Sequence, residues 1–522
     1  MTPATAVAGL VGDFVQQLQH LQRLKARLAE IHNVNAARAV LNWDQSTYMP
    51  PGGAAARADQ LATLGAIGHR AFVDAETGRL LEGAEREVRV AGFDADSDEA
   101  RLVHVTRRDY DQATRVPTDF VEEMARAHAL AYEVWVAARA ANNFADFAPW
   151  LRKNVELARR QADYLGYTEH PYDALLDQYE PDATIAQVQP LFDHLRAALV
   201  PLLRDITAHA DRVDDAVLHR PYDKEAQLRF SEDVVRQFGY DFSRGRLDLT
   251  VHPFATGFSR DDVRITTRVD PQFLQVCLMG TMHEAGHGLY EQGIGVNLVG
   301  TPLAGAASLG IHESQSRLWE NVVGRGESFW RHYVPLAQRA FPTALGDADA
   351  DTLYRAFNKV SPSLIRIEAD EVTYNLHLML RFELERKLLE GSLAVDDLPE
   401  AWNAAMRDYL GITPPNDAEG VLQDMHWSGG LIGYFPTYTI GTVLSVQFYE
   451  AAVRDAPDIP AGIARADFAP LLGWLQAHIY RHGRKFTPDE LVRRATGRSI
   501  DPEPYLRYLR DKFGRLYGLS EE

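Results

Sequence analysis

Met282-His-Glu-Ala-Gly-His-Gly288 is the stretch that tells most about this sequence. It contains the pattern H-E-x-x-H, in which His283 and His287 are one helical turn apart, so both imidazoles can reach one metal ion. Glu284 lies beside them, where it can take a proton from an attacking water molecule. The preceding residues 273–279 are mostly apolar. The stretch therefore predicts a buried metal-binding helix that also carries a catalytic base.

The third metal ligand has to come from elsewhere, because catalytic zinc sites usually have three protein ligands and one open position. The metzincin pattern requires a histidine at position 293, where Gly293 stands, so that class is excluded. A carboxylate from a following helix is the other common solution, and Glu313 opens the helical stretch 310–320. Glu291 and Glu320 are the alternatives. The predicted ligand set is His283, His287 and Glu313, with zinc as the expected metal and cobalt as a possible substitute.

Helical periodicity dominates the sequence on both sides of this stretch. An apolar stripe at helical spacing runs from Phe14 to Ile31, and similar stripes begin at Leu151 and Phe192. One region breaks the helical period: near residues 247–268 apolar and polar residues alternate, which predicts a short β-hairpin or small sheet. The expected fold class is mainly α with a minor β element.

The chain contains no internal repeat, low-complexity run or Pro/Ser-rich linker, so we expect a single domain over residues 1–522. Within it we expect an N-terminal helical part over 1–245, the catalytic motifs over 246–440 and C-terminal helices over 441–522.

Composition limits the compartment and the partners. The formal net charge of −19 argues against nucleic acid or an anionic membrane as the main partner. Cys277 is the only cysteine, which fits a reducing, cytoplasmic location. The N-terminal MTPATAVAGLVGDF lacks the basic region of a signal peptide. Residues 427–449 carry no Lys, Arg, Asp or Glu, but several Gly and a Pro interrupt them, so we expect a buried segment rather than a membrane span.

Six short blocks give the sequence a specific resemblance to the thermostable metallocarboxypeptidase (carboxypeptidase Taq) family. The blocks are His252-Pro-Phe254, Asp262-Val-Arg-Ile-Thr266, His283-Glu-Ala-Gly-His287, His312-Glu-Ser-Gln315, Ile365-Arg-Ile-Glu-Ala-Asp370 and Gly420-Val-Leu-Gln-Asp-Met-His-Trp427. The resemblance implies a large helical fold with a deep active-site groove, a homodimer, and release of single amino acids from the C-termini of peptides.

The resemblance also suggests which residues bind substrate. An arginine suits recognition of a free α-carboxylate, because its planar guanidinium binds a carboxylate bidentately. Arg366 is the first candidate and Arg264 the second, and a structural ion pair is the alternative for each. His252 and His312 are weaker candidates for contacts with substrate or with metal ligands.

Stabilisation of the oxyanion requires a donor near the metal. His426 and Tyr434 look like the His and Tyr pair of related zinc dipeptidases and oligopeptidases. Tyr434 is therefore the expected donor, with Tyr438 as the alternative and His426 assisting.

Two other functions have to be weighed. H-E-x-x-H plus a glutamate also occurs in zinc oligopeptidases and dipeptidases that cut inside short peptides, and only the accessory blocks favour a carboxypeptidase. A non-catalytic helical scaffold with a structural zinc is the second alternative. Three ligands with an adjacent glutamate base favour an open, catalytic site over that reading.

Overall fold

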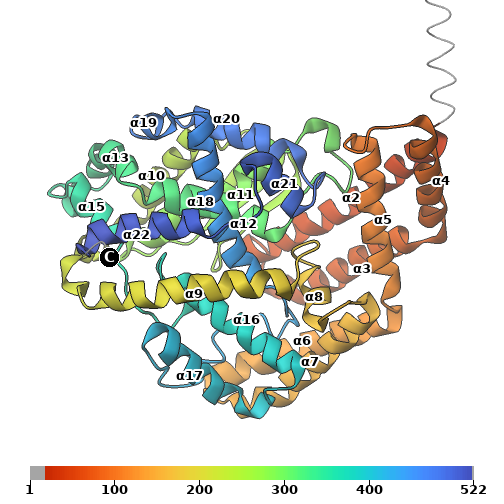
Figure 1. The fold of residues 1–522 in the computed structure, drawn as a ribbon, viewed down its shortest axis with the longest axis horizontal. Coiled ribbons are helices and arrows are strands. Elements are labelled where there is room, and N and C mark those ends of the chain that lie inside the picture. Colours follow the sequence, from red (N-terminus) through yellow and green to blue (C-terminus); the bar gives the residue numbers. More distant parts are fainter. Residues whose placement is uncertain (1–17, 520–522) are drawn as a thin grey trace, which may run out of the picture.

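The computed structural model describes residues 18–519, and helices make up most of it (Figure 1). Residues 1–14, for which no signal peptide is predicted, lie outside the described residues, and so does Phe14 of the first apolar stripe. The first helices are α2 (Gln19–Thr47), α3 (Ala54–Val73), α4 (Ala75–Ala91), α5 (Asp98–Arg115), α6 (Thr118–Ala141), α7 (Phe144–Leu165), α8 (Pro171–Leu176), α9 (Ile185–Thr207) and α10 (Lys224–Phe238). The central elements are β1 (Gly245–Leu249), β2 (Ala255–Ser259), β3 (Asp262–Thr267), α11 (Leu274–Gly293), α12 (Leu309–Arg317) and the π-helical segment η5 (Leu318–Gly324).

Helices continue to the end of the described chain. They are α13 (Glu327–Ala340), α14 (Pro342–Leu345), α15 (Ala350–Phe357), α16 (Tyr374–Glu390), α17 (Leu398–Leu410), α18 (Pro436–Asp455), α19 (Ile459–Ile463), α20 (Ala469–His478), α21 (Pro488–Thr496) and α22 (Glu503–Tyr517). Short 3₁₀ turns join them: η1 (Pro51–Gly53), η2 (Ala210–Arg212), η3 (Ala216–His219), η4 (Val296–Leu298), η6 (Arg366–Glu368), η7 (Val395–Asp397) and η8 (Tyr480–His482). The predicted fold class, mainly α with a small sheet, is confirmed.

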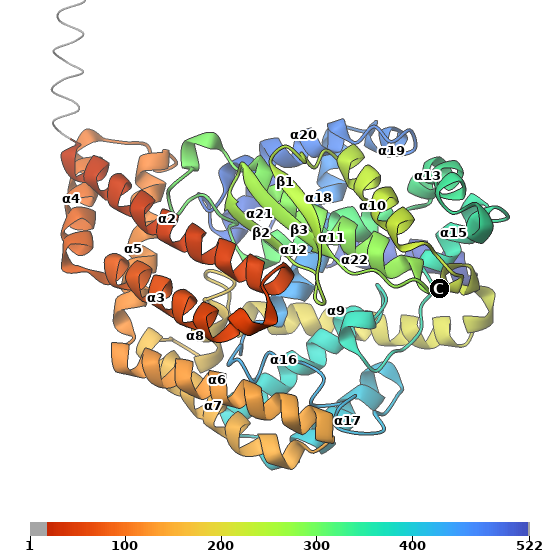
Figure 2. The same ribbon diagram turned by 180° about the vertical axis from the view of Figure 1, so that it is seen from behind.

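The helices are arranged around α11 and α12. In Figure 1 the N-terminal helices α2–α5 lie at one side of the molecule, while α6, α7, α16 and α17 gather at its lower edge. Seen from behind, the sheet lies between α2 and α10 (Figure 2). Helix α11 contacts β2 and β3, and α12 contacts both α11 and α18. The metal-binding helix predicted from the sequence is therefore central in the fold.

The small sheet near residues 247–268 has the order β1-β3-β2. Strands β2 and β3 form the antiparallel hairpin, with an irregularity between Gly257 and Ser259, and β1 runs parallel to β3. In β1 the alternation does not mark a buried apolar face: Leu249 is 40% exposed, whereas Asp248 is buried. Asp248 can be buried there because it accepts hydrogen bonds from Tyr48, at the end of α2, and from Arg246.

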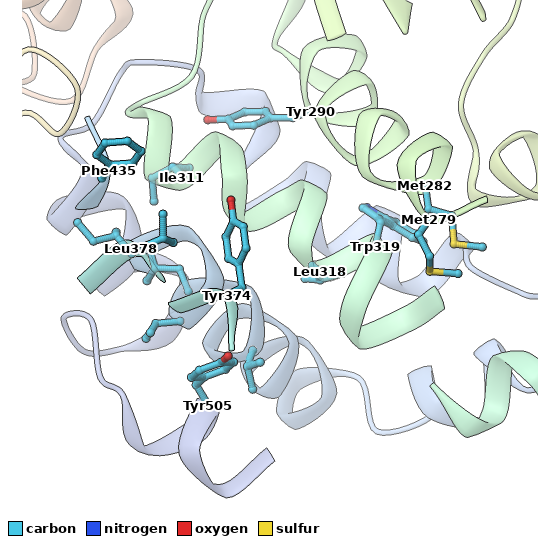
Figure 3. Packing of buried hydrophobic residues seen from close by; sticks show 14 of the residues in the cluster. Met279, Met282, Tyr290, Ile311, Leu318, Trp319, Tyr374, Leu378, Phe435 and Tyr505 are labelled. Atoms are coloured by element: carbon cyan, nitrogen blue, oxygen red, sulfur yellow. The ribbon is translucent and has the colours of Figure 1, made fainter. Parts of the chain in front are cut away.

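Apolar side chains from distant parts of the sequence form the core. Figure 3 shows Met282 of α11, Ile311 of α12, Leu378 of α16 and Tyr505 of α22 in this region, and all four are buried. Burying one such large apolar side chain stabilises the folded state by about 1.5–3 kcal/mol. Helix α18, which contains much of the uncharged stretch 427–449, is largely buried. Within residues 18–519, no helix is long and apolar enough to cross a membrane.

Two glycines allow α12 to fit tightly between α11 and α18. A Cβ atom on Gly286, inside the H-E-x-x-H pattern, would lie 2.6 Å from the backbone oxygen of Gln315. A Cβ atom on Gly441 would lie 2.6 Å from the Cβ of Glu313. Neither position can hold a larger residue unless backbone or buried side-chain atoms move, because real Cβ atoms do not approach so closely. Glycine at these positions therefore lets α12 bring Glu313 close to α11.

Candidate metal centre and active-site groove

The side chains of His283, His287 and Glu313 converge on one point between α11 and α12. One ligand atom from each lies within 4.8 Å of the others, and no other such group of three is found in the described part of the chain. Nε2 of His283 is 3.6 Å from Oε2 of Glu313, and Nε2 of His287 is 3.5 Å from the same oxygen. Ligands bound tetrahedrally at about 2.0–2.2 Å lie about 3.3–3.6 Å apart, so these three residues fit a zinc-sized ion.

A buried carboxylate orients His283. Its Nδ1 donates to Oε2 of Glu320 at 2.9 Å, which leaves Nε2 facing the metal site. Glu320 also accepts hydrogen bonds from Arg317 and Arg325. Burial works to raise the pKa of Glu320, but the hydrogen bond from His283 and the charge of Arg317 outweigh it and lower that pKa to about 2. Glu320 was an alternative third metal ligand in the sequence. In the structure it contacts His283, and it does not belong to the three residues that converge on the candidate metal position.

A second polar chain orients His287. Nδ1 of His287 is 2.5 Å from Nδ1 of His312, and Nε2 of His312 is 3.0 Å from Oε1 of Glu291. Burial and the neighbouring His312 lower the pKa of His287 to about 3, which favours the neutral imidazole that binds metal. The sequence offered His312 as a weaker contact candidate and Glu291 as an alternative ligand. In the structure His312 contacts His287, and Glu291 contacts His312.

Glu313 is held as a carboxylate by its own helix. Nε of Arg317 donates to Oε1 at 2.6 Å, and the Ser316 hydroxyl donates to Oε2 at 3.1 Å. Glu313 is only 5% exposed, and burial works to raise its pKa, but Arg317 and the two histidines hold that pKa far below its usual range. The residue is thus charged, as a metal ligand must be.

The start of α12 is also fixed by polar groups. The Ser308 hydroxyl accepts from the backbone N–H of Ile311 at 3.0 Å, and the carboxylate of Glu180 accepts from the N–H of Gly310. Burial raises the pKa of Glu180 to about 8. Nothing in the sequence pointed to Glu180, because its contact with α12 spans 130 positions.

Glu284 faces the same groove as the metal ligands. It is 6% exposed, and burial raises its pKa to about 7. A carboxyl group with a pKa near neutrality can both accept and return a proton, as a general base and acid requires. The groove has a volume of about 620 Å³, within the range of small-ligand pockets. Besides the metal ligands and Glu284, its lining includes Arg108, Asp109, Tyr179, Phe254, His312, Tyr434, Tyr438 and Arg484.

The sequence and the fold were compared with those of known proteins. The family model for the carboxypeptidase Taq (M32) metallopeptidases matches residues 23–513. The chain belongs to this family. It is 42% identical to thermostable carboxypeptidase 1 of Thermus thermophilus over 513 residues, which cover 96% of this chain and 99% of that protein. It is 38% identical to carboxypeptidase 1 of Bacillus subtilis over 491 residues, covering 94% and 97% of the two chains.

Among solved structures, the M32 carboxypeptidase of Deinococcus radiodurans R1 superposes with a TM-score of 0.93. It is 46% identical, and the match covers 96% of this chain and 100% of the other. The family predicted from the six sequence blocks is confirmed, and the chain is a metallopeptidase of the carboxypeptidase type.

In this M32 chain the tyrosines predicted as oxyanion donors both line the groove. The rings of Tyr434 and Tyr438 are 5.3 Å apart, and the ring of His426 is 5.4 Å from that of Tyr434. Burial lowers the pKa of His426 to about 4, so its ring is neutral near pH 7. His426 is not among the residues that line the groove, so the two tyrosines are nearer to its open space.

Arg366 lies beneath this tyrosine pair as part of a buried charge cluster. Its guanidinium donates to Oδ1 of Asp424, with Nη2 at 2.8 Å, and Arg381 donates to Oδ2 at 2.6 Å. One carboxylate is thus shared by two guanidinium groups. The Arg366 guanidinium is 5.4 Å from the ring centre of Tyr438. Asp424 belongs to the sequence block 420–427, but the pairing with two arginines is visible only in three dimensions.

The three predicted substrate residues of this M32 chain all lie outside the groove lining, including Arg366, which is buried in its charge cluster. Arg264 of β3 donates twice to Asp262 at 2.9 Å and stacks 4.2 Å from the ring centre of Trp43 on α2. These contacts are the structural ion pair considered as its alternative. His252 is exposed in the turn between β1 and β2, although the next two residues of its block, Pro253 and Phe254, line the groove.

Proposed function

We propose that this protein is a zinc-dependent carboxypeptidase that releases single C-terminal amino acids from peptides with broad specificity. The observation that carries the proposal is the convergence of His283, His287 and Glu313 next to Glu284 in a groove of about 620 Å³. Family membership supports the same activity.

Zinc is the metal favoured by two neutral imidazoles and one carboxylate in tetrahedral spacing, and cobalt is the alternative. A divalent cation bound there supplies Lewis-acid polarisation of the scissile carbonyl and lowers the pKa of water. Glu284 takes the proton from the attacking water and delivers a proton to the leaving amine. Tyr434, with Tyr438 as the alternative and His426 assisting, donates a hydrogen bond to the oxyanion.

Arg366 is proposed to recognise the α-carboxylate of the substrate, with Arg264 and His252 as alternatives. The cluster of Arg366, Arg381 and Asp424 contains two positive charges and one negative charge, so its net positive charge attracts a substrate carboxylate, although both guanidinium groups are bonded to Asp424 and lie outside the groove lining. This local charge opposes the overall charge of −19, which repels acidic groups at long range.

The activity is tested with paired peptides that carry a free or an amidated C-terminus. We expect stepwise release of C-terminal residues from the free peptide, at least about 10-fold slower cleavage of the amide, and loss of both after chelation, with recovery on adding zinc or cobalt. Mass spectrometry of the peptide ladder provides the measurement. Equal cleavage of both peptides would indicate an oligopeptidase.

Replacing Arg366 tests recognition of the carboxylate. Loss of a charge-assisted hydrogen bond costs about 1.5–3 kcal/mol, so Arg366→Met should lower kcat/KM for free peptides by about 10–100-fold. The amidated peptide should lose much less, because it has no carboxylate to bind. Arg264→Met is the matched variant, and a larger loss there than at Arg366 would transfer the role to Arg264.

We also propose a homodimer in the cytoplasm, with residues 1–522 acting as one domain. The family resemblance supports the dimer, and a single, buried Cys277 is consistent with a reducing compartment. One buried hydrophobic cluster that extends from Leu18 to Tyr517 supports the single domain. Light scattering during gel filtration measures the oligomeric state.

A further inference from the structure

Glu385 on α16 is a deeply buried carboxylate that accepts hydrogen bonds from uncharged groups. It is 1% exposed. Oε1 accepts from Nε1 of Trp427 at 2.8 Å, and Oε2 accepts from the hydroxyl of Tyr172 at 2.8 Å and from the backbone N–H of Gly433 at 3.1 Å. Burial raises the pKa of Glu385 to about 7. A carboxylate is costly to bury, and this cost is offset only while its hydrogen bonds are made.

Two of these donors lie at the ends of the segment between the proposed oxyanion residues. Trp427 directly follows His426, and Gly433 directly precedes Tyr434. One carboxylate therefore ties together both ends of residues 427–433. His426 and Tyr434 are close together in the sequence, but the sequence motifs do not identify the group that fixes their relative position.

The peptide before Tyr434 has a conformation that depends on this contact. Gly433 has φ of 88°, in the region that favours glycine, and a Cβ atom there would lie 2.9 Å from the backbone nitrogen of Leu176. The backbone N–H of Gly433 points to Glu385. The direction in which the chain enters Tyr434 is therefore set by a tight turn and one hydrogen bond to the Glu385 side chain on α16.

A second buried side chain holds only the beginning of the segment. Nδ2 of Asn154 on α7 donates to the backbone oxygens of Trp427 at 2.8 Å and of Ser428 at 3.1 Å. These bonds do not reach Gly433. Glu385 is thus the side chain that connects the anchored beginning of the segment to its end beside Tyr434.

We infer that Glu385 is a positioning residue of the active site: it fixes the segment 427–433 so that the Tyr434 hydroxyl is held at the oxyanion position. The inference rests on the proposed role of Tyr434. A donor displaced by about 1 Å can lose about 100-fold in rate, so the effect should appear mainly in kcat.

Glu385→Gln tests the inference in a double-mutant cycle with Tyr434→Phe. The amide NH2 cannot accept a hydrogen bond, so either Trp427 or Gly433 loses its acceptor. In the wild-type background we expect kcat to fall by about 10–100-fold, with KM within about twofold and zinc content unchanged. In the Tyr434→Phe background the same substitution should cost less than about twofold, because the hydroxyl it positions is already absent.

Glu383→Gln is the matched control on the same helix. Like Glu385, Glu383 accepts a hydrogen bond from a tyrosine, Tyr409, and it also accepts one from Arg196, but these partners lie on α17 and α9 and not in the segment 427–433. We expect its kcat to equal that of the wild type. If Glu385→Gln does not fold, as judged by circular dichroism, Trp427→Phe breaks one of the two ties and should lower kcat by about 3–10-fold, again only when Tyr434 is present.

Equal losses of kcat from Glu385→Gln in both backgrounds would overturn the inference, because they indicate a general structural role. Full activity of Tyr434→Phe would overturn it as well, while leaving the carboxypeptidase activity itself intact. Failure of the proposed function has a different signature: the wild-type enzyme, loaded with zinc, would then release no C-terminal residues.

Discussion

Glu284→Gln is expected to lower kcat by about 10²–10⁴-fold, because the amide cannot take the proton from the attacking water. The metal content should not change. Glu284 lies beside His283, but the ligand atoms that converge on the metal position come from His283, His287 and Glu313. Single-turnover kinetics on a free-C-terminus peptide, together with elemental analysis of the purified variant, measures both quantities.

The control for this substitution is Glu225→Gln on α10, which makes the same chemical change at an exposed position. It should retain wild-type kcat. Burial raises the pKa of Glu284 to about 7, so the wild-type residue is poised to exchange protons near neutral pH. Wild-type kcat in Glu284→Gln would assign the proton transfer to another group.

Glu313→Gln is expected to weaken zinc binding by at least about 100-fold, since the variant loses a charged ligand. Glu320→Gln should weaken zinc binding less, by about 10–100-fold, because Glu320 orients His283 without meeting the metal. The two glutamates are seven residues apart on one continuous helical stretch, so the ranking separates a ligand from its neighbour. Competition with a chromophoric chelator gives both zinc affinities.

Circular dichroism on the metal-free proteins controls this comparison, because both glutamates are buried and hydrogen-bonded to Arg317. An intact helical spectrum with reduced zinc affinity assigns the effect to the site. Glu313→Gln with wild-type zinc affinity would remove Glu313 from the ligand set and return attention to Glu291 and Glu320.

The three side chains that converge as the candidate metal site are those predicted from the sequence, because the spacing of the two histidines is local. His283 and His287 share a face of any helix, whatever surrounds it. Glu313 could be chosen because it lies in the next helical stretch that carries carboxylates, although that helix begins at Leu309 and not, as predicted, at Glu313. The helical class followed in the same way, since apolar periodicity reflects one buried face of each helix.

The substrate residues were harder to place, because motif membership does not distinguish a groove residue from a structural one. Arg366 and Arg264 occur in equally specific blocks. In the fold Arg366 joins Asp424 and Arg381 beneath Tyr438, whereas Arg264 pairs with Asp262 and stacks on Trp43. Both arginines are held in ion pairs and neither lines the groove, but Arg366 lies next to Tyr438, which does line it.

The sequence by itself determined the family, the helical class and the pattern of two histidines, a base and a downstream glutamate, because each can be recognised from short motifs or local periodicity in the chain. The tertiary structure decided which groups support them. Glu180 meets α12 across 130 positions, Glu320 meets His283 across 37, and Glu385 meets Gly433 across 48. Contacts between residues so far apart in the chain leave no periodic pattern in the sequence from which they could be predicted. The first two form because close packing at Gly286 and Gly441 seats α12 between α11 and α18. All three form because buried polar groups must find partners where water is excluded.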